Sequence, residues 1–280
     1  MVFDISAQAG ILGPETLDLA VPFFAEHGWW ASPICLGERL LNGLERDIDR
    51  YYAGERDRKV SRSDGSPWAE RTTGPLRRGN CLSLLMDGCR SFVMDPLLPS
   101  IAARLARTSE IRLLHDQVWY KEAGCSEAGA TTIGWHHDKS FWGGCASENL
   151  ISAWVPLADC SMEMGPLTFV DASHRSDSLD PRAARVPMTL RRGQVSFHHC
   201  RTIHGSGANR STDRRVAFCI HYQDQANIST APEGGDGAAE LFLDSLLRVT
   251  TDGTPDYLDP VVCPRLWPPV PVESDESAAP

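Results

Sequence analysis

The first third of the chain has apolar residues at helical spacing. One helix is expected where apolar side chains recur every three or four positions, at Leu40, Leu41, Leu44, Ile48 and Tyr51. A second is expected over 17–25, ended by Gly28, with a short strand after it, and a third begins near Pro99. The charged, Gly- and Ser-rich stretch 53–80 predicts a long loop.

From about residue 111 the pattern changes to short apolar or aromatic runs separated by turn residues. These runs are 111–120, 131–137, 150–157, 166–170, 194–197 and 216–222. Several short strands at this spacing predict a sandwich or barrel. Between the runs 166–170 and 194–197, the stretch 175–192 contains five arginines and is expected to form a polar insertion. It is either a lid over a cavity or a solvated loop, and the residues leave both open.

A chain of 280 residues that is 42% hydrophobic and 23% charged suits one large globular domain. We expect a single domain over 1–263, with N-terminal helices over about 14–108 and a β core over about 109–225. A C-terminal extension would follow over 226–263. The stretch 264–280 is rich in Pro, Ser and acids, which predicts a flexible tail.

Charge and cysteine content narrow the possible functions. A formal net charge of −10 argues against nucleic acid as a partner. Membrane insertion is not expected, because Asp18 and Glu26 break the longest apolar N-terminal stretch and no signal-peptide charge pattern precedes it. Nine scattered cysteines without a CxxC motif indicate reduced thiols in a cytoplasmic protein.

The segment Trp135-His136-His137-Asp138 is the main candidate for chemistry. On a strand, His136 and Asp138 would point the same way and His137 the opposite way. One imidazole and one carboxylate supply two arms of a two-His-one-carboxylate site, the arrangement of non-haem Fe(II) oxygenases. A His-x-Asp pair alone is common by chance, so its significance depends on the sequence downstream.

Three segments together resemble the phytanoyl-CoA dioxygenase-like (PhyH) branch of the Fe(II)/2-oxoglutarate-dependent oxygenases. They are WHHD (135–138), SAWVPLADCSMEMGPLTFVDASHR (152–175) and IHGSGANRSTDRR (203–215). The resemblance covers about 110–225. It implies a mainly β fold with flanking helices, whose core is a double-stranded β-helix (a cupin-like jelly roll). It also implies Fe(II), 2-oxoglutarate as cosubstrate, and O2.

The resemblance assigns roles to individual residues. His136 and Asp138 match the family's proximal metal ligands, and His204 matches the distal one. Arg215 matches the arginine that pairs with the far carboxylate of 2-oxoglutarate, which a guanidinium binds with two parallel hydrogen bonds. Further matches to cosubstrate contacts are Ser206, Trp154 and Lys121; the prolines that often follow this lysine in the family are absent here.

His199 is a rival of His204, because Arg210 follows it at the same interval of eleven residues at which Arg215 follows His204. We favour His204, since a Gly-Ser-Gly turn comes directly after it and an apolar strand begins at Arg215. The candidates for lining the substrate cavity are Gln117, Trp119, Phe141, Trp142 and His199.

The resemblance implies an oxygenase that hydroxylates a small molecule, such as a natural-product or secondary-metabolite scaffold, and releases succinate and CO2. Desaturation, epoxidation or cyclisation by the same iron chemistry stays open. Two other classes remain as alternatives. A zinc hydrolase would use the same triad but has no need for Arg215. A metal-binding jelly-roll module would bind without turnover.

Overall fold

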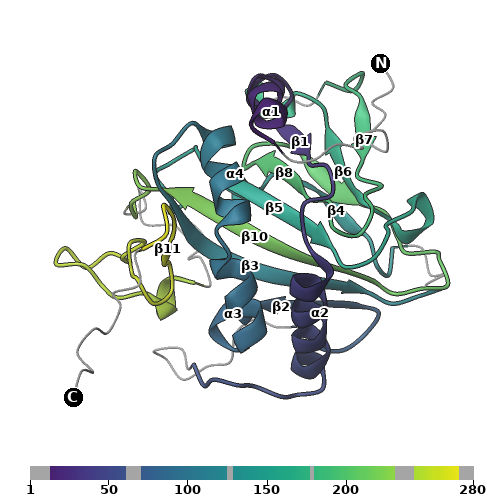
Figure 1. The fold of residues 1–280 in the computed structure, drawn as a ribbon, viewed down its shortest axis with the longest axis horizontal. Coiled ribbons are helices and arrows are strands. Elements are labelled where there is room, and N and C mark those ends of the chain that lie inside the picture. Colours follow the sequence, from purple (N-terminus) through teal and green to yellow (C-terminus); the bar gives the residue numbers. More distant parts are fainter. Residues whose placement is uncertain (1–12, 61–70, 125–128, 177–179, 231–242, 271–280) are drawn as a thin grey trace, which may run out of the picture.

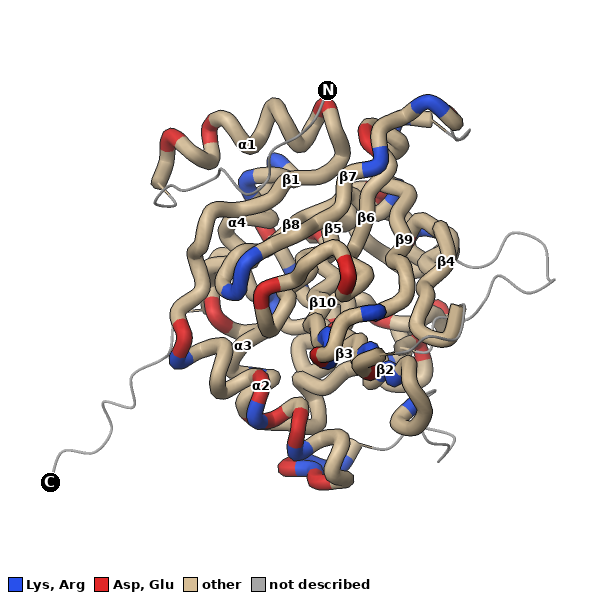
Figure 2. The backbone as a smooth tube through the Cα atoms, turned by 90° about the vertical axis from the view of Figure 1, so that its right-hand side faces the viewer, with Lys and Arg blue, Asp and Glu red and all other residues tan. Residues whose placement is uncertain are grey.

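The computed structural model describes residues 13–60, 71–124, 129–176, 180–230 and 243–270. They form two facing antiparallel sheets, with helices on the outer side of the larger sheet (Figures 1 and 2). The larger sheet has the order β1-β8-β5-β10-β3-β11, and β2 also pairs with β3; the smaller has the order β4-β9-β6-β7. This arrangement confirms the prediction of a mainly β jelly roll with flanking helices.

The strands of the larger sheet are β1 (Trp29–Ala31), β2 (Leu76–Asn80), β3 (Ile111–Lys121), β5 (Ile151–Pro156), β8 (Ser196–His199), β10 (Arg215–Asp224) and β11 (Arg265–Trp267). Those of the smaller sheet are β4 (Ile133–His136), β6 (Leu167–Val170), β7 (Arg185–Pro187) and β9 (His204–Ser206). The helices are α1 (Pro14–His27), α2 (Glu38–Tyr52), α3 (Asp87–Met94) and α4 (Leu97–Ala106). None of the described helices has the length and apolar content needed to cross a bilayer.

Alternation along the larger sheet separates an apolar outer face from a polar inner face. On β10, Val216, Phe218 and Ile220 belong to the core under the helices. The intervening Arg215, Cys219 and His221 face the space between the sheets, where they line a cavity. Strand β3 alternates in the same way. Successive side chains on a strand point to opposite faces, so one period-2 pattern builds both the core and the cavity wall.

Two stretches differ from the sequence-based expectation. Part of the expected loop 53–80 is strand β2, and part of the expected tail 264–280 is strand β11. Both pair with β3, at opposite ends of that strand. Neither segment has an alternating apolar pattern, so the sequence does not predict a strand there. A short edge strand can form without that pattern, because it gains its backbone hydrogen bonds from its neighbour whatever its side chains are. Residues 271–280 of the predicted tail lie outside the described residues.

Two arginines of the segment 175–192 contact different parts of the structure. Arg185 begins β7, and its guanidinium lies 5.8 Å from the centre of the Trp135 ring. Arg192 forms ion pairs with Glu38 and Glu45 of α2, each at 3.1 Å. Arg192 therefore fastens this segment to a helix. Residues 177–179 lie outside the described residues.

Candidate active site

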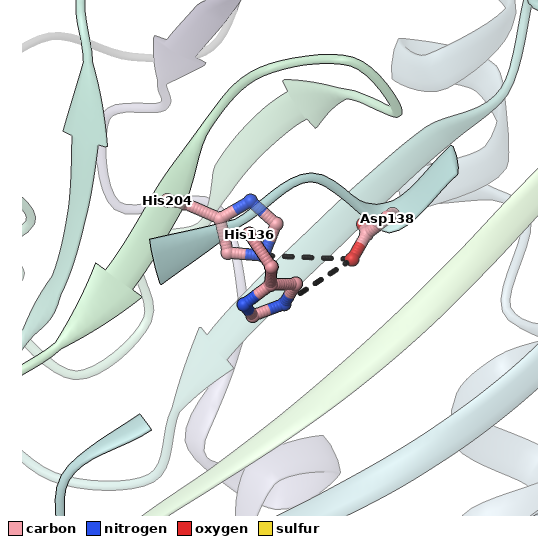
Figure 3. Close-up of side chains that lie close together, drawn as sticks. All are labelled: His136, Asp138 and His204. Carbon is pink, nitrogen blue, oxygen red and sulfur yellow. Dashed lines mark ion pairs between the residues drawn. The ribbon is translucent and has the colours of Figure 1, made fainter. Parts of the chain in front are cut away.

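His136, Asp138 and His204 come together between the two sheets (Figure 3). One ligand atom from each lies within 4.8 Å of the others. His136 ends β4 and pairs with His204, the first residue of β9. Asp138 is not on the strand, contrary to the argument from alternation: β4 ends at His136, and Asp138 begins a 3₁₀ turn that directs its carboxylate back toward the two rings. A second local expectation also fails: the Gly-Ser part of the turn expected directly after His204 lies instead in strand β9, which begins at His204 and ends at Ser206.

Backbone carbonyls fix the orientation of both imidazoles. Nδ1 of His136 donates to Gly134 O at 2.8 Å, and Nδ1 of His204 donates to Thr202 O at 2.9 Å. The other ring nitrogens, Nε2, face Oδ1 of Asp138 at 3.9 Å and 3.4 Å. A histidine whose Nδ1–H is used in this way presents the Nε2 lone pair to a metal.

The second oxygen of Asp138 is held by two residues that the sequence analysis did not assign to the site. Oδ2 accepts hydrogen bonds from Ser152 Oγ at 2.6 Å and from His198 Nε2 at 3.1 Å. Only Oδ1 is therefore directed at His136 and His204. Such partners of a ligating carboxylate orient it and tune its metal affinity. Alternation places Ser152 on the same face of β5 as Trp154, but the sequence alone does not show that this face meets Asp138.

The electrostatics of the cluster suit a divalent cation. Burial opposes the charge on Asp138, but His204 and His198 outweigh it and hold the pKa of this carboxyl well below its usual value. Burial also opposes charge on His204, yet the facing carboxylate raises the pKa of His204. Burial lowers the pKa of His198 and of His221 to about 4, so both are neutral. Two imidazoles with one carboxylate are the donor set of non-haem iron.

A small inner chamber of about 60 Å³ adjoins the cluster and is lined by Arg215, Ser206 and Trp154. Arg215 is 3% exposed and lies 5.7 Å from the centre of the Trp154 ring. Nε and one terminal nitrogen of its guanidinium have no hydrogen-bond partner. Burying a charged group without partners is costly, so this side chain is arranged for an anionic ligand, and its fork fits a carboxylate.

Lys121 is fully buried and contacts the chamber through Ser206, which lines it. Its Nζ donates to Ser206 Oγ at 2.7 Å and to Gly207 O at 2.5 Å. Burial and the neighbouring charge of Arg215 lower the pKa of Lys121 to about 6. The lysine therefore positions the Ser206 hydroxyl and adds a group whose pKa an incoming anion would raise, so that it takes up a proton from solvent.

A larger outer chamber of about 430 Å³ meets the inner one at His136 and Asp138. Of the residues predicted for the substrate cavity, four line it: Gln117, Trp119, Phe141 and Trp142. Gln117 and Trp119 also line the inner chamber. Phe141 is 57% exposed and lies at the mouth, whereas Trp142 is buried. A mostly apolar chamber beside a metal-type cluster is the usual form of a small-molecule site.

His199 is placed elsewhere, which corrects the prediction that it lines the substrate cavity. It lines neither chamber, and its ring lies 5.5 Å from that of His174. Its Nδ1 accepts a hydrogen bond from the Arg201 backbone N–H. The cause is alternation on β8: His198 faces inward to Asp138, so its neighbour faces outward.

The chain matches the family described as phytanoyl-CoA dioxygenase (PhyH) over residues 24–217. Among curated proteins, a probable alpha-ketoglutarate-dependent hypophosphite dioxygenase of Stutzerimonas stutzeri is 26% identical over 174 residues. An ectoine dioxygenase of Bordetella bronchiseptica is 26% identical over 190 residues. These alignments cover 54% and 53% of this chain, but only 58% and 62% of the relatives' own lengths.

Among solved structures, the epimerase SnoN in complex with Fe³⁺, alpha ketoglutarate and nogalamycin RO is similar over most of its length. The two chains are 25% identical, the match covers 91% of this chain and 100% of the other, and the TM-score is 0.70. The same jelly-roll arrangement of sheets thus carries an iron and alpha-ketoglutarate site in a protein of known structure.

Proposed function

The chain belongs to the phytanoyl-CoA dioxygenase family, and on this premise we propose that it is an Fe(II)/2-oxoglutarate-dependent oxygenase. In this proposal His136, Asp138 and His204 bind the iron, and Arg215 binds the far carboxylate of 2-oxoglutarate. One observation supports it above the rest: a buried guanidinium with two unsatisfied nitrogens shares a chamber with a His-Asp-His cluster. Neither a zinc hydrolase nor a passive metal site needs that arginine.

Each residue then has a defined task. The two histidines bind through Nε2, and Asp138 binds through Oδ1 while Ser152 and His198 retain Oδ2. A facial set of three protein ligands leaves positions for the oxo and carboxylate groups of the cosubstrate. When bound, iron with 2-oxoglutarate supplies the oxidation of a substrate C–H bond by O2, with release of succinate and CO2.

The inner chamber holds the cosubstrate in this scheme, and the outer chamber holds the substrate. Arg215 and Ser206 bind the far carboxylate, Lys121 positions Ser206, and Trp154 closes the wall. The outer chamber would take a small molecule, which we infer to be a natural-product or secondary-metabolite scaffold that is hydroxylated. Its size and aromatic walls support that inference, as does the similarity to SnoN, an epimerase from nogalamycin biosynthesis.

Anaerobic titration of the metal-free protein with Fe(II) and then 2-oxoglutarate tests the proposal. We expect a visible absorption band that needs both components, because 2-oxoglutarate bound directly to Fe(II) gives a metal-to-ligand charge transfer. Zn(II) in place of Fe(II) is the control and should give no band. Binding of Fe(II) without the band would contradict the assignment of 2-oxoglutarate as cosubstrate.

Cosubstrate binding should also take up a proton. Lys121, with its pKa at about 6, is mostly neutral at neutral pH; a carboxylate placed beside it offsets the Arg215 charge and raises that pKa. We expect uptake of up to about one proton per 2-oxoglutarate near pH 7.5; uptake should fall to about half near pH 6 and vanish toward about pH 5, where the lysine is already charged. Calorimetry in buffers of different ionisation enthalpy measures it. Equal uptake by Lys121→Met would refute the assignment.

A further inference from the structure

The walls of the outer chamber favour a flat apolar ligand. Trp119 and Trp142 form its inner part, and Trp135 and Phe141, 54% and 57% exposed, stand at the mouth. Large aromatic side chains left exposed around a cavity mark a binding site and not a packed core. Aromatic side chains on several sides suit a ligand that itself contains aromatic or fused rings.

His221 gives this chamber one hydrogen-bond acceptor. The single hydroxyl hydrogen of Ser152 is donated to Asp138 Oδ2, so the 2.7 Å contact between Ser152 Oγ and His221 Nδ1 is donated by His221. A neutral imidazole has one N–H, and Nε2 therefore carries a lone pair. This nitrogen is buried and without a partner, and His221 lines both chambers. It fits a ligand hydroxyl.

Arg78 gives the chamber a cation. Alternation on β2 sends Arg77 to the other face, where it forms an ion pair with Glu122 at 2.5 Å, and turns Arg78 toward the ring of Trp119 at 5.5 Å. The guanidinium of Arg78 thus stands in the wall of the outer chamber, beside one of its aromatic side chains. An acidic group on the ligand would match Arg78.

The sheet register sets the spacing of these two groups. Arg78 pairs with Trp119 on β3, and His221 pairs with His115 on the same strand. The two β3 positions are four residues apart, or roughly 13 Å along the strand. Because β2 and β10 pair with opposite edges of β3, Arg78 and His221 are also about 10 Å apart across the sheet. Both side chains line the outer chamber, so a ligand with polar groups at the two ends of a fused-ring system can lie between them.

We propose that the outer chamber binds a fused-ring aromatic acid, whose acidic group contacts Arg78 and whose hydroxyl group donates to Nε2 of His221. The inference rests on the proposed function, since it takes this chamber as the substrate side of the iron site. It makes Arg78 and His221 the residues that determine specificity, one for charge and one for the hydroxyl.

The test uses three probes, 6-hydroxy-2-naphthoate, 2-naphthoate and 2-naphthol, titrated by quenching of tryptophan fluorescence. Mn(II) and saturating 2-oxoglutarate fill the inner chamber, and a parallel series omits 2-oxoglutarate. We expect Arg78→Gln to weaken both acids by about 10- to 100-fold and to leave 2-naphthol unchanged. Arg77→Gln is the matched control and should change none of them. His221→Phe should remove the preference for 6-hydroxy-2-naphthoate over 2-naphthoate.

Equal effects of Arg78→Gln and Arg77→Gln on the acids would overturn the inference, and so would a wild type that binds 2-oxoglutarate but none of the probes. A wild type that binds the probes with the expected dependence on Arg78, yet fails to bind 2-oxoglutarate, would contradict the proposed function and leave this assignment standing. The two failures are therefore distinct.

Discussion

His204→Ala is expected to abolish metal binding and turnover while the fold is retained. His204 supplies one of the three ligand atoms, and its Nε2 faces the Asp138 carboxylate at 3.4 Å. Loss of a residue that merely supports a ligand costs 10–100-fold in metal affinity, so loss of a ligand should cost at least about 1,000-fold, or roughly 4 kcal/mol. Anaerobic Fe(II) titration measures the affinity, and far-ultraviolet circular dichroism checks the fold.

His199→Ala is the matched control, because the sequence offers His199 with Arg210 as the rival pair. Its ring packs near His174 and lines neither chamber, so the variant should bind Fe(II) as the wild type does. If His199→Ala lost the metal and His204→Ala kept it, the ligand assignment would be wrong.

The sequence predicts the β core and the members of the cluster for different reasons. The strands follow from short apolar or aromatic runs separated by turn residues; the runs 111–120 and 216–222 lie within β3 and β10. Strand alternation predicts that His136 and Asp138 lie together, whereas in the structure a 3₁₀ turn brings the carboxylate round. The His-x-Asp motif thus predicts that the two side chains lie together, although the strand geometry inferred from it is wrong for Asp138.

Other features depend on tertiary pairing and leave little trace in the sequence. Strands β2 and β11 form because β3 leaves one edge open, the other being paired with β10, and Arg77, Arg78 and Arg265 are ordinary strand residues. Ser152 is an ordinary serine until β5 and the turn after β4 bring it within 2.6 Å of Asp138. Likewise, no pattern distinguishes the inward His198 from the outward His199 without the register of β8.

Arg215→Gln is expected to weaken 2-oxoglutarate binding by about 100-fold, or roughly 3 kcal/mol, because a charge-assisted pair is replaced by a neutral contact. Fe(II) affinity should stay the same, since the arginine is not among the three ligands. Arg214→Gln is the control: Arg214 alternates to the outer face, where it forms an ion pair with Asp49 at 2.7 Å, and its loss should not alter cosubstrate affinity.

A second ligand separates the role of Arg215 from general damage to the site. 2-Oxobutyrate keeps the oxo-acid group that chelates iron but lacks the far carboxylate, so wild type and Arg215→Gln should bind it equally. Thermal stability should not fall in the ligand-free variant, because an arginine buried with unsatisfied nitrogens opposes folding. Equal weakening of 2-oxoglutarate and 2-oxobutyrate would mean that Arg215 supports the chamber wall, and the far carboxylate would then need another partner.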